Sequence, residues 1–104
     1  MTTWEQVQQT IAGFVSITND WDGLDAPAPG LAAIDKARRW ATFLKQWGAP
    51  PPDRVLVGVN ANIFLEWEDG SEYREIEFDV VGHAVATRLK EHSGDQPACT
   101  QVVL

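Results

Sequence analysis

The side chains best suited to chemistry in this 104-residue chain are concentrated in one short segment, residues 19–29. Three carboxylates surround one glycine there: Asp20, Asp22, Gly23 and Asp25. Carboxylates spaced around a glycine are typical of calcium-binding loops, in which the glycine takes the sixth position. That alignment puts Thr18 and Pro29 at the first and twelfth positions, where such a loop needs carboxylates. We therefore expect no metal site.

The same segment has two further interpretations, a structural clasp or a recognition element. Asp side chains in turns accept hydrogen bonds from nearby backbone N–H groups, and Gly23 can adopt the left-handed conformation that such turns need. Trp21 is a large aromatic side chain in a connection that would normally be polar, which indicates either burial or binding. As part of a clasp, Trp21 is expected to fill the gap where the two flanking helices meet. The residues concerned are Asp20, Trp21, Asp22, Gly23 and Asp25.

Catalysis has three other candidate side chains, His83, His92 and Cys99. Neither histidine has a recognisable catalytic partner in the sequence, which is typical of ordinary surface histidines. No helix begins near Cys99 to activate its thiol, and the three residues fit no zinc spacing. We expect a protein that is not an enzyme, with no catalytic residue, no metal and no cofactor. The alternative is an enzyme that uses His83 or the loop carboxylates.

The second half of the chain contains a predicted β-hairpin. Residues 63–68 and 72–79 alternate between apolar and polar side chains, and Asp69-Gly70 between them is a strong turn signal. A two-residue turn at Asp69-Gly70 pairs Glu68 with Ser71, and so on along both strands. One face then carries the apolar residues that we expect the helices to cover: Ile63, Leu65, Trp67, Ile76 and Phe78. The opposite face, named the acidic face here, carries Phe64, Glu66, Glu68, Tyr73, Glu75, Glu77 and Asp79.

The acidic face carries charge of one sign, whereas a sheet that is only solvated usually mixes Lys with Glu. Phe64 and Tyr73 lie within it, as aromatic anchors do at interfaces. We predict a non-catalytic module that binds the basic surface of another protein through this face. An antitoxin, an immunity protein or an inhibitor of a nucleic-acid-binding machine (such as an anti-CRISPR protein) would fit. The alternative is a structural homodimer whose acidic face is merely solvated.

Two helices are predicted before the hairpin. The first spans residues 3–17, with Thr3 as N-cap and Gln6 as its reciprocal partner. Its apolar residues follow helical spacing: Trp4, Val7, Ile11, Phe14 and Val15. The second lies between Pro29 and Gly48 and has one apolar stripe: Leu31, Ile34, Ala37, Ala41 and Leu44. Three aromatic residues widen this stripe, so we expect it to contact both the first helix and a sheet: Trp40, Phe43 and Trp47.

Strands are predicted near residues 55–59 and 84–89 in addition to the hairpin. Helices followed by strands indicate an α+β fold, here two N-terminal helices packed on one face of a three- or four-stranded antiparallel β-meander. The chain is expected to be a single domain over residues 1–104, with a compact part at about 3–90. Residues 91–104 are expected to form a flexible tail or an edge strand.

Composition limits the partners. The net charge of −7 argues against direct nucleic-acid binding, because contacts to phosphates need Lys and Arg. No apolar run has the length that a bilayer requires, and the N-terminus lacks a signal-peptide pattern, so we expect a cytoplasmic protein with no membrane contact. The single cysteine allows no internal disulfide. Five tryptophans in so short a chain support the homodimer alternative.

The Trp-Asp-Gly segment resembles that of a group of small, uncharacterised bacterial proteins. These have an Asn-Trp-Asp-Gly-x-x-Ala segment before a helix and a Leu-Glu-Trp-like run in a later strand. The matching positions are Trp21, Asp22, Gly23, Ala26 and Pro27, with Leu65, Glu66 and Trp67 later in the chain. Asp20 stands between Asn19 and Trp21, which departs from the pattern. The resemblance covers residues 19–79 and implies an accessory protein of mobile or defence-linked loci, without an activity that can be carried over.

Overall fold

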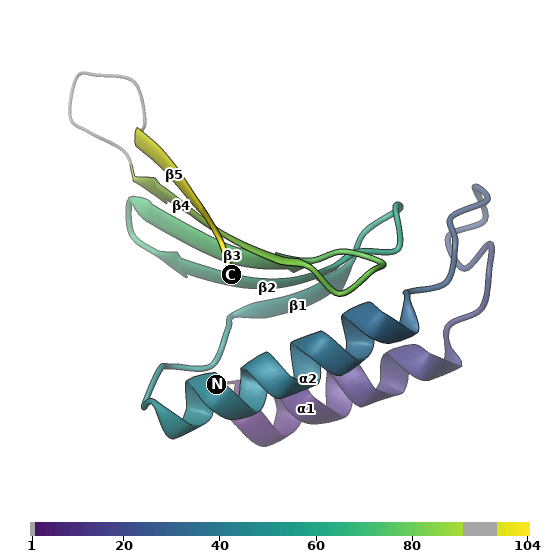
Figure 1. Cartoon of the computed structure of the whole chain (residues 1–104), viewed down its shortest axis with the longest axis horizontal. Helices are drawn as coiled ribbons and strands as arrows, with labels where there is room; N and C mark the ends of the chain where they lie inside the picture. The colour runs from purple at the N-terminus through teal and green to yellow at the C-terminus, as the bar shows by residue number, and fades with distance from the viewer. Residues whose placement is uncertain (1, 91–97) are drawn as a thin grey trace.

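The structure is a computed structural model that describes residues 2–90 and 98–104 in two layers. Two helices, α1 (Trp4–Gly13) and α2 (Leu31–Gln46), lie side by side against one face of a five-stranded antiparallel sheet (Figure 1). A single 3₁₀ turn, η1 (Phe14–Ser16), follows α1. The strands are β1 (Arg54–Val57), β2 (Ile63–Asp69), β3 (Glu72–Phe78), β4 (Ala84–Lys90) and β5 (Ala98–Val103). Each strand pairs with its neighbours in sequence.

The predicted α+β class is confirmed, but the predicted number of strands is too low. The additional strand is β5, which lies in the segment for which either a flexible tail or an edge strand was expected. Residues 91–97, with His92 among them, lie outside the described residues.

The cap of α1 is the one predicted. Thr3 Oγ1 accepts the Gln6 N–H at 3.2 Å, and the Gln6 side chain accepts the Thr3 N–H at 2.9 Å. This reciprocal arrangement satisfies two N–H groups at the helix start and is worth about 1 kcal/mol. The α-helix ends at Gly13, earlier than predicted, because glycine is a poor helix former and the chain tightens there into η1.

The buried side of α2 is built largely from alanine, which lets the helix lie close to the sheet. Its buried residues are Ala33, Ile34, Ala37 and Ala41. The predicted stripe is wrong at Leu31, which is 74% exposed. Steps of three residues drift around a helix, so Leu31 stands about 120° from Ala37, away from the sheet.

α2 contacts both α1 and the sheet, as predicted, and its three aromatic residues lie along one side of the helix. The side chain of Gln8 in α1 reaches the Arg38 carbonyl and the Thr42 hydroxyl, which lie on the other side of α2. Trp40 packs against the core, whereas Phe43 and Trp47 are 42% and 75% exposed. This aromatic side of α2 therefore faces away from α1.

The β2–β3 hairpin turns one residue later than predicted. Gly70 and Ser71 form the turn, instead of Asp69 and Gly70. Gly70 has φ 58°, which glycine adopts without strain at the first central position of such a turn. The pairing shifts by two residues, so that Leu65 faces Ile76. Because side chains alternate with a period of two, this shift leaves every residue on its predicted face.

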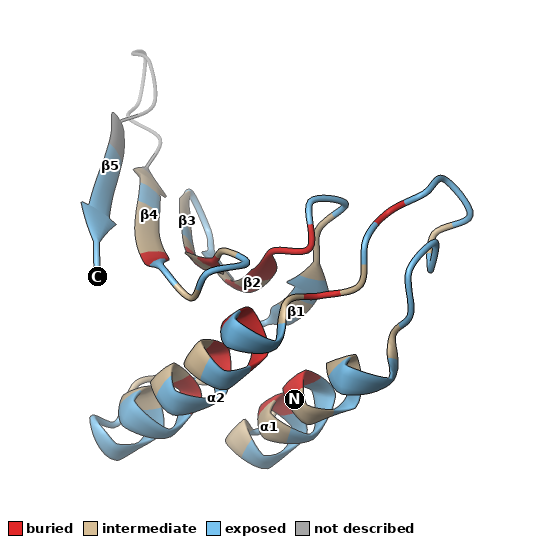
Figure 2. Cartoon of the chain, turned by 45° about the vertical axis from the view of Figure 1, so that its right-hand side comes forward, coloured by how far each residue is buried: buried red, intermediate tan, exposed pale blue. Residues whose placement is uncertain are grey.

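The helices cover only part of the sheet, as the colouring of residues by burial in Figure 2 shows. α1 contacts β1, and α2 contacts β2 and β3. The core lies between these elements and contains Val7, Ile11, Ala33, Ile34, Ala37, Ala41, Ile63, Leu65, Ile76, Phe78 and Ala84. The described residues of β5 are exposed along the strand.

Two tryptophans fix the proline-rich connection between α2 and β1. The Trp4 indole N–H donates to the Ala49 carbonyl, and the Trp67 indole N–H donates to the Pro50 carbonyl, each at 2.9 Å. Pro52 is fully buried. These contacts join both layers at one point and set where β1 begins.

Candidate protein-binding face

The acidic face lies on the outer side of the sheet, the side turned away from the helices. The register of β2 and β3 pairs its members directly: Phe64 with Glu77, Glu66 with Glu75 and Glu68 with Tyr73. The structure therefore brings these six residues together on adjacent strands. Like charges that stand opposite each other destabilise a sheet, so the Glu66–Glu75 pair needs groups that offset its repulsion.

Arg54 of β1 supplies one such group, which no local sequence pattern indicates. β1 pairs Arg54 with Glu66. Its Nε lies 3.0 Å from Glu66 Oε1, and its Nη2 lies 2.9 Å from Glu68 Oε2. Hydrogen bonds to Glu66 and then to Glu68 raise the pKa of the Arg54 guanidinium. With five carboxylates and this one cation, the acidic face stays negative.

Tyr73 supplies the second group. Its hydroxyl lies 2.6 Å from Glu66 Oε2 and 3.0 Å from Glu75 Oε1. Burial, followed by hydrogen bonding to these two carboxylates, raises the pKa of the Tyr73 phenol well above its ordinary value of 10.0. Tyr73 is half-buried and places its hydroxyl between two carboxylates, to either of which its one proton can be donated.

Phe64 is also half-buried, and it lies across the end of β1. A Cβ atom at Gly58 would come within 2.8 Å of the Phe64 ring, so the glycine makes room for it. Beside it, the Asn62 side chain donates to the Glu77 carboxylate. Asn62 is itself buried, so this bond fixes Glu77 to the start of β2.

Asp79 follows β3 and organises the turn to β4. Its Oδ1 accepts the backbone N–H groups of Val81 and His83 at 3.0 and 2.9 Å. The hydrogen bond from the His83 backbone is the main cause that lowers the pKa of Asp79. The exposed His83 ring lies 3.4 Å from Asp79 Oδ2. Asp79 therefore shapes the turn and stands at the end of the acidic face.

The carboxylates of residues 20–25 bind the backbone of their own loop. Asp22 Oδ1 accepts the N–H groups of Leu24 and Ala26 at 2.9 and 3.0 Å. Asp20 Oδ1 accepts the Asp25 N–H at 2.8 Å. The bond from Leu24 is the first of the causes that lower the pKa of Asp22. Gly23 takes the left-handed conformation, with φ 75°.

Trp21 does not lie between the helices, as the clasp interpretation expected. Its indole N–H donates to the Pro27 carbonyl at 2.8 Å, and the residue is 38% exposed. The loop extends past the ends of both helices (Figure 1), so Trp21 packs on its own loop. Asp20 and Asp25 also have positive φ, at 62° and 64°. The segment is thus a self-contained turn that exposes part of an aromatic ring.

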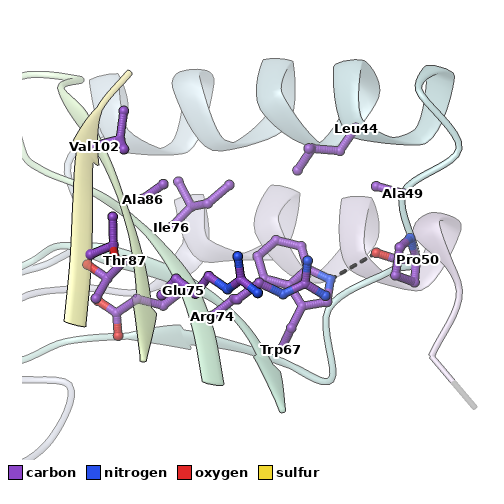
Figure 3. A pocket seen from close by; sticks show the side chains of 12 residues that line it. Leu44, Ala49, Pro50, Trp67, Arg74, Glu75, Ile76, Ala86, Thr87 and Val102 are labelled. Carbon is purple, nitrogen blue, oxygen red and sulfur yellow. Dashed lines mark hydrogen bonds between the residues drawn. The ribbon is translucent and has the colours of Figure 1, made fainter. Parts of the chain in front are cut away.

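A second surface, which the sequence pattern does not predict, lies on the inner side of the sheet beyond α2. It is a groove of about 310 Å³ (Figure 3). Its apolar lining includes Trp67 of β2 and residues of α2, β3, β4 and β5: Leu44, Ile76, Ala86 and Val102. Arg74 and Arg88 flank it, and Glu72 binds both, at 3.8 and 2.6 Å. The groove exists because the helical layer stops short of β4 and β5.

Over residues 2–90 and 98–104, no three His, Cys, Asp or Glu side chains are grouped so that they could hold a metal ion. Neither α1 nor α2, the two α-helices of the described part, has the length and apolarity needed to cross a bilayer.

Comparisons of the chain with protein-family models, curated proteins and solved structures find no match. The resemblance of the Trp-Asp-Gly segment to a bacterial group therefore stays a prediction.

Proposed function

We propose that this protein is a small, non-catalytic protein-binding module whose acidic face receives a basic surface of another protein. The observation that carries the proposal is the network in which Arg54 and Tyr73 hold Glu66, Glu68 and Glu75. Side chains that are fixed before a partner arrives lose little conformational entropy on binding.

The geometry of the face suggests the chemistry of the partner. Alternate carboxylates on one strand stand about 6.7 Å apart, and residues paired across strands stand about 5 Å apart. Such a lattice suits several Lys or Arg side chains, because charge-assisted hydrogen bonds to carboxylates are strong. Proteins that bind nucleic acid present surfaces of this kind to phosphates. An antitoxin, an immunity protein or an inhibitor of a nucleic-acid-binding machine, including one of the anti-CRISPR type, would use the face in this way.

The test compares two triple variants that change the net charge equally. The face variant carries Glu68→Gln, Glu75→Gln and Glu77→Gln, in which glutamine keeps the size and one acceptor oxygen of each side chain. The control variant carries Glu5→Gln, Asp25→Asn and Asp35→Asn, all away from the acidic face. Both variants and the natural chain are used to capture proteins from the source cells, and the captured partner is then purified for kinetics.

We expect the natural chain and the control variant to capture the same partner and the face variant to lose it. For that partner, the association rate constant at low salt should fall about tenfold in the face variant, because complementary charge mainly accelerates association. Its dependence on salt should flatten at the same time. Equal capture by all three proteins, or equal association rates at low salt, would refute the proposal.

A further inference from the structure

The open edge of β5 offers backbone hydrogen-bonding groups to another strand. The Leu104 N–H donates to the Ala84 carbonyl at 2.8 Å, so these two residues form a hydrogen-bonded pair. Hydrogen-bonded and non-hydrogen-bonded pairs alternate in an antiparallel ladder. Thr100 and Val102 therefore direct their backbone groups to β4, whereas Gln101 and Val103 direct theirs outward. Among the described strands, β5 pairs with β4 alone.

The sequence of this edge lacks the usual protection against pairing. Natural edge strands carry Lys, Pro, other charges or bulges, or are very short. Residues 98–104 contain no charged residue and no proline, and β5 is six residues long. At the opposite edge of the sheet, β1 has four residues and begins with Arg54. The two edges thus differ in length and in charge.

Each side of β5 carries an exposed valine. Val102 lies on the inner side, where it lines the groove beyond α2, and is 53% exposed. Val103 is on the outer side, opposite Val85 of β4, and is 78% exposed. An exposed apolar surface that continues around an edge strand is typical of an association site.

We propose that β5 pairs with β5 of a second copy of this chain, in antiparallel orientation, and joins two sheets into one. Identical antiparallel strands fit a two-fold axis, so that each copy contributes the same surface. A strand without charged residues has no group that a charged partner could complement. An identical strand can pair with it without charge repulsion. The homodimer considered from the sequence would then form through the sheet edge rather than through the tryptophans of the helices.

Repulsion between the two acidic faces does not oppose this pairing. The nearest carboxylates of the face are on β3, and five strand spacings would separate β3 of one copy from β3 of the other. At about 4.8 Å each, that distance is about 24 Å, or three times the Debye length at physiological salt. The acidic face is thus kept away from the edge that would associate.

The test measures the mass of the protein in solution by light scattering over a range of concentrations. The natural chain, with a mass of 11.5 kDa, should approach twice that mass as concentration rises. Gln101→Pro removes an N–H that points outward while the hydrogen bonds between β4 and β5 remain. Val103→Lys adds a charge on the outer side of the edge. Both variants should stay monomeric, and circular dichroism with cooperative thermal melting verifies that they are folded.

Leu56→Lys is the matched control, because it adds the same charge on the outer side of β1, at the opposite edge of the sheet. It should dimerise as the natural chain does. A natural chain that remains monomeric at the highest concentration would overturn the proposal. So would a dimer that survives both edge variants, or one that Leu56→Lys also abolishes. The Glu→Gln face variant should still dimerise, which separates this test from that of the acidic face.

Discussion

The hydroxyl of Tyr73 is the group in the acidic face whose removal is most informative. Tyr73→Phe deletes one oxygen and leaves the ring, so the packing of the half-buried side chain is retained. The lost hydroxyl lies 2.6 Å from Glu66 Oε2 and 3.0 Å from Glu75 Oε1. Because it has only one proton to donate, we count a single charge-assisted hydrogen bond.

Hydrogen bonds to charged groups contribute about 1.5–3 kcal/mol, and partial exposure places this one at the lower end, about 1.5 kcal/mol. For a domain of this size each kcal/mol corresponds to about 4–8 °C in Tm, so Tyr73→Phe should melt about 6–12 °C lower. Urea denaturation measures the free energy of unfolding directly, and thermal melting gives the second value.

A double-mutant cycle shows whether the loss comes from the network. Tyr73→Phe combined with Glu66→Gln should cost less than the sum of the two single changes, because both changes act on the same charge-assisted hydrogen bond. The same change combined with Glu5→Gln, far away in α1, should be additive. An unfolding free energy unchanged within about 0.5 kcal/mol, or additivity in both cycles, would show that the network does not hold the face together.

Three further results are expected. The chain has one tyrosine, so the rise in absorbance near 295 nm on phenol ionisation reports Tyr73 alone. This ionisation should begin only well above pH 10 in the folded protein. A titration midpoint near pH 10 in the folded protein would contradict the placement of Tyr73. Gly58→Ala should lower the free energy of unfolding by about 1–2 kcal/mol in urea denaturation, because the added Cβ meets the Phe64 ring. Gly13→Ala should raise the same free energy by about 0.5–1 kcal/mol, because the space around Gly13 is open. The folded pKa of Asp79 is lowered, so its contribution is complete above its unfolded value of 3.8 and is lost as pH falls through the folded pKa. Asp79→Ala should therefore melt below the natural chain at pH 7 and approach it in melts near pH 2.

Local patterns in the sequence determined most of the secondary structure. The capping box at Thr3 and Gln6 involves only neighbouring residues, so the sequence alone predicts it. The sequence also predicts the two faces of the hairpin, because side chains alternate between the faces along each strand. Even the error in the turn at Gly70 did not move any side chain to the wrong side, since the pairing shifted by two residues.

Contacts between distant segments were decided only by the tertiary structure. Arg54 joins Glu66 and Glu68 through the pairing of β1 with β2, and nothing near Arg54 in sequence indicates those partners. Trp4 and Trp67 bind the same proline-rich connection from two different layers.

The sequence alone determined which residues are apolar, which are charged and which of them share a face, because hydrophobicity and periodicity are local properties. It did not fix how much of the sheet two helices can cover. That depends on the close packing of α2 on β2 and β3 through small residues such as Ala37 and Ala41. This packing leaves the inner side of β4 and β5 open, and so creates the groove.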